Sequence, residues 1–433
     1  MAKTYNIITY GCAMNRSDSE RIAAVLDQAG YRKARKSQRP DILVFNACSV
    51  RQTAIDRIYG RANNLRKLPP SSRFAGLRRA RKTIVTGCIL PRDREKFAEI
   101  FDLVLNIKDL KSLPKLLTGL KAKPVADISY FKIKPFQQNS FSARVPISFG
   151  CSRFCSYCAV PYTRGLEINR SAKEIISEVK GLIKRGFKEI WLLGQTVSSW
   201  KDPQNKKYKF VDLLAEIEKI PGKFWVRFES SYVLDFDDKL INFLAKAKKV
   251  NNYLNLPLQS GSDKILKKMN RKYTVKQYLA VLNKMKAKIP DFNFSTDIIV
   301  GFCKEAEADF KKTYGVFAKI RPAMAYIAQY SPRSGTAAQK HMRDNVSLNT
   351  KKIRHKKLNQ LLRQIAKENM AKEIGRTLDV LVDAWSPQKR ECLGKTRNFK
   401  TVRFESKKNL TGQFVKVKIF KAREFELEGE LIR

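Results

Sequence analysis

The stretch Gly150-Cys-Ser-Arg-Phe-Cys-Ser-Tyr-Cys158 places three cysteines in a CxxxCxxC spacing, directly after a predicted β-strand at residues 144–149. Three thiolates on so short a loop can converge on one iron–sulfur cluster, and a glycine at the first position lets the loop turn sharply. Cys151, Cys155 and Cys158 would bind three irons of a cubane 4Fe–4S cluster. The fourth iron would stay open for another ligand.

A structural zinc site explains these cysteines less well. Closed zinc sites take four ligands, and the two histidines of the chain, His341 and His355, are remote from the loop in sequence. The remaining alternative is simple burial, because an unligated cysteine behaves as a small hydrophobic residue. Chance clustering at this spacing is a poor explanation, so we expect a cluster.

Around this loop, six predicted strands alternate with helices between residues 143 and 370. This alternation is typical of an α/β fold with an open or partial (βα)6, TIM-like barrel, whose active site lies at the carboxyl ends of the strands. The predicted strands are residues 144–149, 189–193, 225–229, 253–257, 294–300 and 325–330. A long basic helix is predicted at residues 347–374.

The two ends of the chain predict different folds. Residues 1–120 alternate short strands with helices, which predicts a parallel α/β domain. A basic loop at residues 69–82 and a linker at residues 121–142 complete this half. Residues 371–433 contain short, closely spaced, β-branched segments, which predict a small β-barrel.

The bulk composition limits the class of protein. The chain has 433 residues, so two to three domains are expected. Lys and Arg number 87 against 40 Asp and Glu, and this net charge of +47 predicts a polyanionic partner. An anionic membrane surface is the alternative, but no stretch of 18 apolar residues indicates a span. The start MAKTYNIITY has no signal-peptide pattern, so we expect no membrane partner and a cytoplasmic protein.

Three further cysteines each follow a predicted strand of the first domain: Cys12, Cys48 and Cys88. Taken singly, each is more simply a buried small residue than a ligand. The carboxyl ends of parallel strands share one edge of a sheet, however, so the three thiols could share a second cluster. Disulfides are a poor explanation in a large chain without a secretion signal.

The central loop resembles the CxxxCxΦC signature of the radical S-adenosylmethionine enzymes, with Tyr157 as the aromatic residue near the adenine. This resemblance implies that S-adenosylmethionine chelates the open iron through its amine and carboxylate. The reduced cluster would then cleave the cofactor to a 5′-deoxyadenosyl radical.

Nearly the whole chain resembles the methylthiotransferases. The matching segments are YGCAMNRSDSE, FNACSVRQTAIDRIYG, LLGQTVSSW, LPLQSGSDKILKKMNRKYT, STDIIVGF and YSPRSGTAA. The resemblance implies that Cys12, Cys48 and Cys88 hold an auxiliary iron–sulfur cluster, also of the 4Fe–4S type, and that the tail is a TRAM-like domain. CSVRQTA and GKTRNFKTVRFE are most similar to the MiaB-type branch, which modifies tRNA.

The resemblance also implies a reaction. One S-adenosylmethionine methylates a sulfur of the auxiliary cluster, and a second supplies the radical that removes hydrogen from carbon 2 of an adenine. An aromatic C–H is neither acidic nor electrophilic enough for ordinary acid–base catalysis, so a cofactor radical must carry the step. The implied substrate is isopentenyl-adenosine next to the anticodon. The implied partners are the tRNA anticodon stem-loop, an electron donor such as flavodoxin or ferredoxin, and a sulfur donor, and we expect a monomer.

Five polar or small residues in the matched motifs lie at predicted strand ends and are expected to line the cofactor pocket: Gln195, Gln259, Ser260, Asp297 and Gly301. Strand-end capping explains any one of them equally well. Glu229 and Arg333 are weaker candidates. Four sites depart from the family pattern: Ala13 where Gln is usual, Thr196 in place of Asn, Ser231-Tyr232-Val233 in place of Ser/Pro-His-Pro, and Cys303-Lys304 in place of the common Pro-Gly.

The tail interleaves cations with aromatic residues, which suits phosphate contacts and base stacking. The expected RNA-binding residues are Lys395, Arg397, Phe399, Lys400 and Arg403. The alternative is a small barrel with an ordinary soluble surface. Other substrates within the family class are threonylcarbamoyl-adenosine in tRNA and an aspartate of a ribosomal protein. A different class is a non-catalytic iron–sulfur protein that binds RNA.

Overall fold

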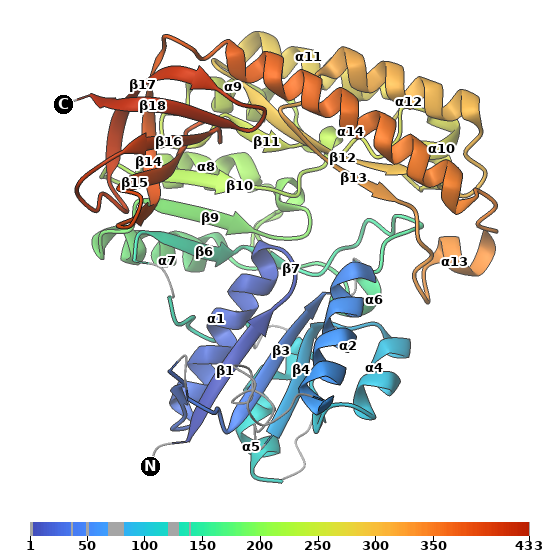
Figure 1. The fold of residues 1–433 in the computed structure, drawn as a ribbon, viewed down its shortest axis with the longest axis vertical. Helices are drawn as coiled ribbons and strands as arrows, with labels where there is room; N and C mark the ends of the chain where they lie inside the picture. Colours follow the sequence, from blue (N-terminus) through green and yellow to red (C-terminus); the bar gives the residue numbers. More distant parts are fainter. Residues whose placement is uncertain are drawn as a thin grey trace.

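The computed structural model describes residues 3–35, 38–48, 52–67, 82–119, 130–137 and 140–432. An α/β domain, a larger barrel and a small β-barrel follow one another along the chain (Figure 1). The predicted basic loop lies outside the described residues apart from Lys82, and so do residues 121–129 and 138–139 of the predicted linker.

The amino-terminal domain is a five-stranded parallel sheet in the order β2-β1-β3-β4-β5. Its strands are β1 (Thr4–Thr9), β2 (Arg32–Lys33), β3 (Ile42–Cys48), β4 (Lys82–Cys88) and β5 (Leu103–Val104). Its helices are α1 (Ala13–Gln28), α2 (Gln52–Lys67), α4 (Pro91–Ala98), the 3-10 helix η1 (Ile107–Ser112) and α5 (Leu113–Leu117). All seven residues of β3 are buried, as expected for a strand covered on both faces. The predicted parallel α/β domain is confirmed.

The central barrel consists of two three-stranded parallel sheets, β10-β9-β6 and β11-β12-β13, linked by an isolated parallel bridge between Val226 and Val250. The strands are β6 (Ser142–Pro146), β9 (Glu189–Leu193), β10 (Trp225–Phe228), β11 (Tyr253–Asn255), β12 (Asn293–Val300) and β13 (Met324–Gln329). The predicted partial barrel is confirmed.

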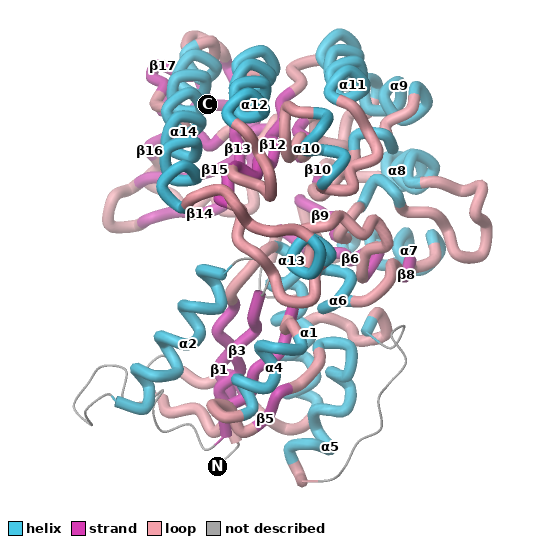
Figure 2. Tube along the Cα trace, turned by 90° about the vertical axis from the view of Figure 1, so that its right-hand side faces the viewer, coloured by secondary structure: helices cyan, strands magenta, loops and turns pink. Residues whose placement is uncertain are grey.

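Helices surround the barrel strands, as Figure 2 shows. They are α6 (Val160–Arg164), α7 (Ala172–Lys184), α8 (Phe210–Lys219), α9 (Asp238–Lys246), α10 (Asp263–Lys268), α11 (Val275–Lys288), α12 (Glu307–Ile320), α13 (Ala337–His341) and α14 (Leu348–Ala371), with short 3-10 helices η3 (Val197–Ser199) and η4 (Val233–Asp235). The amphipathic helices α7, α8 and α9 bury their apolar sides in one core with the strands.

The strand predicted at residues 144–149 is wrong as a single element. It divides into β6 and a two-residue strand, β7 (Ser148–Phe149), which pairs in the antiparallel sense with β8 (Ile168–Asn169). The backbone N–H of Ile147, between the two, donates to Leu193 O at 2.8 Å. The chain therefore leaves the barrel sheet just before the cysteine loop.

The amino-terminal domain lies at the carboxyl ends of the barrel strands, and β1, β3 and β4 run toward the barrel (Figure 1). Part of the predicted linker belongs to this domain, because Tyr130 and Ile133 are buried in its hydrophobic core. At the interface, Arg144 of β6 forms an ion pair with Glu20 of α1 at 2.8 Å.

The carboxyl-terminal strands form a closed barrel in the order β14-β15-β16-β18-β17, as predicted. They are β14 (Thr377–Ser386), β15 (Glu391–Thr396), β16 (Thr401–Glu405), β17 (Phe414–Ala422) and β18 (Glu426–Ile432). This barrel packs against the amino-terminal ends of the central strands, where Phe414 contacts Trp225 with ring centroids 4.9 Å apart. Within the described residues, no helix is both long and apolar enough to cross a bilayer.

Arg227 of β10 anchors this junction. It is fully buried, forms an ion pair with Glu189, and donates from Nη2 to Thr396 O at 3.1 Å. Replacing Arg227 by Met would leave the Glu189 carboxylate buried without its cation, so we expect the free energy of unfolding in urea to fall by about 3–5 kcal/mol. Lys284→Met breaks an exposed pair with Asp238 and is the matched control. Equal unfolding midpoints for the two variants would contradict the anchoring role.

Candidate cluster-binding sites

The first thiol triad lies on the loop that follows β7. Gly150 has a φ of +79°, and a Cβ there would collide with the carbonyl oxygen of Leu166, so only glycine fits. The Cys151 N–H donates to Gly165 O at 3.0 Å, and the Cys158 N–H donates to Cys155 O at 2.9 Å. These two bonds hold both ends of the loop, and Cys158 interacts electrostatically with Cys155 and Cys151.

Polar groups from the barrel contact these sulfurs. Thr196, at the carboxyl end of β9, places its Oγ1 3.6 Å from Cys151 Sγ. Arg271 donates from Nη1 to Cys155 Sγ at 3.3 Å. Burial, and secondarily the charge of Cys155, raises the pKa of Cys158 to about 12, so the unligated thiol keeps its proton at neutral pH.

Four buried polar oxygens close to this loop or on strand ends have no hydrogen-bond partner among the described residues: Ser148 Oγ, Gln195 Oε1, Ser231 Oγ and Gln259 Oε1. Buried polar atoms without partners are uncommon in folded proteins and suggest a missing ligand. S-Adenosylmethionine carries amine, carboxylate, hydroxyl and adenine groups that could satisfy them. The residues present therefore fit this cofactor.

The other candidates for the cofactor pocket have structural contacts of their own. Asp297 accepts from Asn255 Nδ2 at 3.0 Å, and its charge, after burial, raises the pKa of the Glu229 carboxyl. Tyr157 is half buried and packs with its ring centroid 6.4 Å from that of Phe302. Their cofactor roles stay predictions.

Ser260 and Gly301 have clear local reasons for their residue types. Ser260 Oγ lies 3.3 Å from Thr313 Oγ1 of α12. Gly301 has a φ of +69°, and a Cβ there would collide with the side chain of Lys351. Packing explains both residues, so a cofactor contact is not needed to account for them.

The second triad lies at the carboxyl edge of the amino-terminal sheet. Cys48 and Cys88 end β3 and β4 and are register partners, on strands that lie about 4.8 Å apart. Cys12 follows β1, and a Cβ on the preceding Gly11 would lie 2.9 Å from Cys48 Cβ. The structure brings the three thiols together as the strand-end argument predicts. Their role as ligands stays a prediction.

A pair of asparagines, which the sequence patterns did not reveal, fixes the position of Cys12. Asn15 Oδ1 accepts from the Cys12 N–H at 3.3 Å, and Asn15 Nδ2 donates to Ala47 O at 2.9 Å. Asn46 Nδ2 donates back to Asn15 O at 2.7 Å. The loop after β1 is thereby tied to the end of β3.

Arg164 connects the two triads. It ends α6, six residues after Cys158, and donates from Nε to Cys88 Sγ at 2.9 Å. Its Nη2 forms an ion pair with Asp18 of α1 at 2.5 Å, and the two side chains are only 2% and 0% exposed. Burial raises the pKa of Cys88 to about 12, while the Arg164 charge opposes this shift. Sequence patterns gave no signal for this residue.

Thiolates are the donors that iron–sulfur clusters take, so both triads fit such a group. Within the described ranges, no three His, Cys, Asp or Glu side chains converge as ligands of a single metal ion. A cubane cluster does not require that convergence, because each thiolate binds a different iron.

Three of the predicted RNA-binding residues lie at the junction between the two barrels. Arg397 donates from Nε to Val250 O at 3.1 Å. The Phe399 ring contacts Tyr253 at 4.9 Å between centroids, and Lys395 lies 5.0 Å from the Phe399 ring. The contacts of Arg397 and Phe399 hold the small barrel on the central one, while Lys395 contacts Phe399 within the small barrel.

The other two form ion pairs with acidic residues of the same chain. Lys400 pairs with Glu373, and Arg403 pairs with Glu391 at 2.7 Å and with Glu426 at 2.9 Å. The RNA-binding role of all five residues stays a prediction, and their contacts give it no support.

Three family models match the chain. The Radical SAM superfamily matches residues 145–316, Uncharacterized protein family UPF0004 matches residues 4–107, and the TRAM domain matches residues 371–432.

Curated relatives are similar over the full length. A tRNA-2-methylthio-N(6)-dimethylallyladenosine synthase from Dictyoglomus thermophilum is 40% identical and covers 99% of this chain and 98% of its own. The enzyme of the same name from Carboxydothermus hydrogenoformans is 36% identical, with 99% of each chain covered. Among solved structures, a radical S-adenosylmethionine methyltransferase from Kitasatospora setae shares the fold, with a TM-score of 0.53 at 12% identity over 76% of this chain and 75% of that one.

The two triads predict two separable clusters. We expect anaerobically reconstituted protein to show two cluster signals, and a variant with Ala at Cys12, Cys48 and Cys88 to lose only one of them. Cys392→Ala, a buried cysteine of the small barrel outside both triads, is the control and should keep both. Iron and sulfide analysis with electron paramagnetic resonance measures the outcome. Full iron and sulfide content in the triple variant would refute the auxiliary site.

Burial also predicts the order in which the thiols of the cluster-free protein react. Cys12 is exposed, whereas Cys88 is buried and has a pKa of about 12. At pH 8, four units lower, the thiolate fraction of Cys88 is on the order of one in ten thousand. We expect iodoacetamide to modify Cys12 well before Cys88, with the Cys88 rate rising as the pH rises. Mass spectrometry of timed samples would reveal equal rates if the burial were wrong.

Proposed function

The chain belongs to the radical S-adenosylmethionine tRNA methylthiotransferases, the family of the tRNA-2-methylthio-N(6)-dimethylallyladenosine synthases, and on that premise we propose how its residues perform the reaction. It is a transferase that modifies tRNA. We propose that it inserts a methylthio group at carbon 2 of N6-dimethylallyl (isopentenyl) adenosine next to the anticodon, with two S-adenosylmethionine per turnover.

One observation supports this proposal most strongly: Arg164, six residues after the last cysteine of the first triad, contacts Cys88 of the second triad and Asp18 in the other domain. A protein that only generated a radical would need one triad. Sulfur insertion needs a second centre close to the first.

The cofactors are S-adenosylmethionine and iron–sulfur clusters, which when bound supply the radical chemistry and the sulfur that side chains lack. Cys151, Cys155 and Cys158 would hold three irons of one cluster and leave the fourth for the cofactor. Cys12 and its partners at the sheet edge would hold the second cluster. Arg164 keeps a buried positive charge beside Cys88.

The barrel residues would bind and orient the cofactor. Gln195 and Gln259 present buried carbonyl oxygens that have no partner within the described part of the chain, so they can accept hydrogen bonds from its donor groups. Ser148 and Ser231 can add hydroxyl contacts. Burial of these groups would help to keep water away from a bound cofactor.

The partner is tRNA, and we propose that its anticodon stem-loop is the part recognised. The reductive step requires an electron donor, for which flavodoxin or ferredoxin is suited, and a sulfur donor must restore the auxiliary cluster after each turnover. We further propose that the protein acts as a monomer in the cytoplasm, where tRNA is found.

The decisive experiment is nucleoside mass spectrometry of tRNA from a strain that lacks its own enzyme and expresses this chain. We expect 2-methylthio-N6-dimethylallyladenosine to appear, and to be absent when Cys151 is replaced by Ala. Methylthio groups found only on threonylcarbamoyl-adenosine would identify that nucleoside as the substrate instead. Unmodified tRNA would contradict the proposal and favour a ribosomal-protein substrate or a non-catalytic role.

A further inference from the structure

A small pocket opens at the seam between the amino-terminal domain and the central barrel. Helices α2 and α4 form one wall, and the loop after β13 forms the other. Its volume is about 190 Å³. That is below the roughly 300–1,000 Å³ typical of small-molecule sites, so it suits a single compact group.

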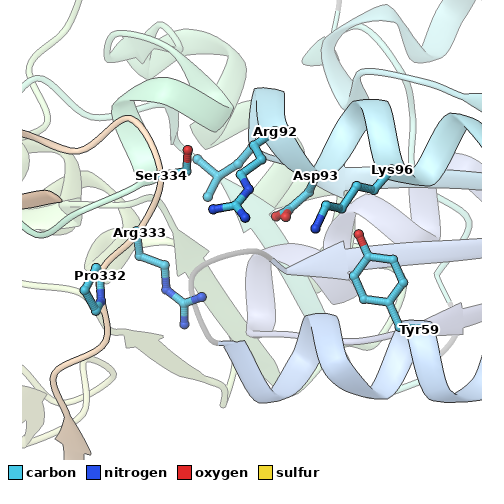
Figure 3. A pocket seen from close by; sticks show the side chains of 8 residues that line it. Tyr59, Arg92, Asp93, Lys96, Pro332, Arg333 and Ser334 are labelled. Atoms are coloured by element: carbon cyan, nitrogen blue, oxygen red, sulfur yellow. The ribbon is translucent and has the colours of Figure 1, made fainter. Parts of the chain in front are cut away.

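Cations dominate the lining of this pocket. Arg92 and Lys96 come from α4, Arg333 comes from the loop, and Asp93 is the one carboxylate among the lining residues, as Figure 3 shows. Arg92 and Lys96 are four residues apart, so they lie on the same face of α4. The lining therefore carries two more positive than negative charges.

The start of α4 faces the same space. Arg92 and Asp93 belong to its first turn, and the residue before the helix, Leu90, provides no side-chain cap. The first N–H groups of a helix lack internal partners and favour an anion. The helix end thus adds to the positive side chains.

Tyr59 supplies a further donor. Its hydroxyl oxygen is buried without a hydrogen-bond partner among the described residues, while its ring packs against Phe97 with centroids 5.0 Å apart. In Figure 3 the Tyr59 hydroxyl points toward the Lys96 ammonium. Burial and the nearby Asp93 charge raise the pKa of Tyr59, so it keeps the proton that it would donate.

Arg333 places the pocket next to the auxiliary triad. Its guanidinium interacts electrostatically with Asp93, Asp56 and Cys48. A group bound in the pocket would therefore lie close to the second thiol site.

We propose that this pocket binds one phosphate of the RNA backbone, close to the nucleotide that is modified. The proposal deepens the function proposed above and rests on it. A phosphate is small, anionic and rich in acceptor oxygens, and it matches Arg, Lys, tyrosine hydroxyl and helix N–H donors. It would hold the RNA at the seam where the two triads meet.

The test measures binding of a fluorescent anticodon stem-loop RNA to the reconstituted protein by anisotropy. Arg92→Ala and Lys96→Ala should each weaken binding about threefold to tenfold, and the slope of log Kd against log salt should fall by about 0.7–0.9 for each phosphate that is no longer neutralised. Arg94→Ala is the matched control, because Arg94 lies on the same helix outside the pocket and is exposed. It should bind RNA like the unchanged protein.

The variant Asp93→Asn should have the opposite effect on RNA affinity. Removing the carboxylate from the pocket should strengthen RNA binding, whereas a merely structural role of α4 would weaken it. Circular dichroism of each variant confirms that the helix still forms.

An RNA series with single uncharged methylphosphonates identifies the contacted phosphate. At that position, the methylphosphonate should weaken binding to the unchanged protein but cause no further loss with Lys96→Ala. Inorganic phosphate should compete only at far higher concentrations than RNA. Tight binding of inorganic phosphate alone would instead assign the pocket to a free anion.

The outcomes separate the two proposals. If the unchanged protein does not bind the stem-loop, the proposed recognition of the anticodon stem-loop is wrong. If it binds, and Arg92→Ala and Lys96→Ala match Arg94→Ala in affinity and salt dependence, the phosphate pocket is wrong while the proposed function stands.

Discussion

The buried ion pair between Arg164 and Asp18 joins the two domains that carry the thiols. Removing two charges from water is costly, and such a pair persists only when its remaining polar atoms are also satisfied. Here the Tyr130 hydroxyl donates to Asp18 Oδ1 at 2.6 Å, and Arg164 Nε donates to Cys88 Sγ. Because α6 follows Cys158 directly, fixing Arg164 also fixes the first triad relative to the second. The position of the amino-terminal domain is thus set by the same residues that bring two reactive centres together.

The two ends of the central barrel contact different domains. The carboxyl ends of its strands face the amino-terminal domain (Figure 1). The cysteine loop and the polar oxygens that lack partners among the described residues lie on that side. The amino ends are closed by the small barrel, through Arg227, Phe414 and the contacts of Arg397. Several basic residues of the tail form contacts within the chain, and their RNA-binding role stays a prediction.

Much of the architecture could be predicted from the sequence, because strand and helix periodicities are local. The placement of Cys12, Cys48 and Cys88 on one edge also followed, since parallel strands end together. Arg164 could not be predicted, because it is 76 residues from Cys88 and 146 from Asp18, and no spacing rule links them. The five predicted RNA-binding residues of the tail show what composition cannot predict. Composition indicates that cations and aromatic residues are present, but not whether they face solvent or a neighbouring domain.

At Cys303-Lys304, which departs from the family pattern, hydrogen bonds stabilise a backbone conformation that glycine would adopt freely. Lys304 has a φ of +62°, the left-handed region that glycine adopts freely and other residues enter at a cost of about 1–2 kcal/mol. Its N–H donates to Asn345 Oδ1 at 2.8 Å, and Glu305 beside it accepts from the Gly301 N–H at 2.6 Å and from Arg354 at 2.7 Å. These bonds offset the strain and hold the turn after β12 without a glycine at this position. These bonds hold the turn that follows β12, the strand in which Asp297 pairs with Tyr326 of β13.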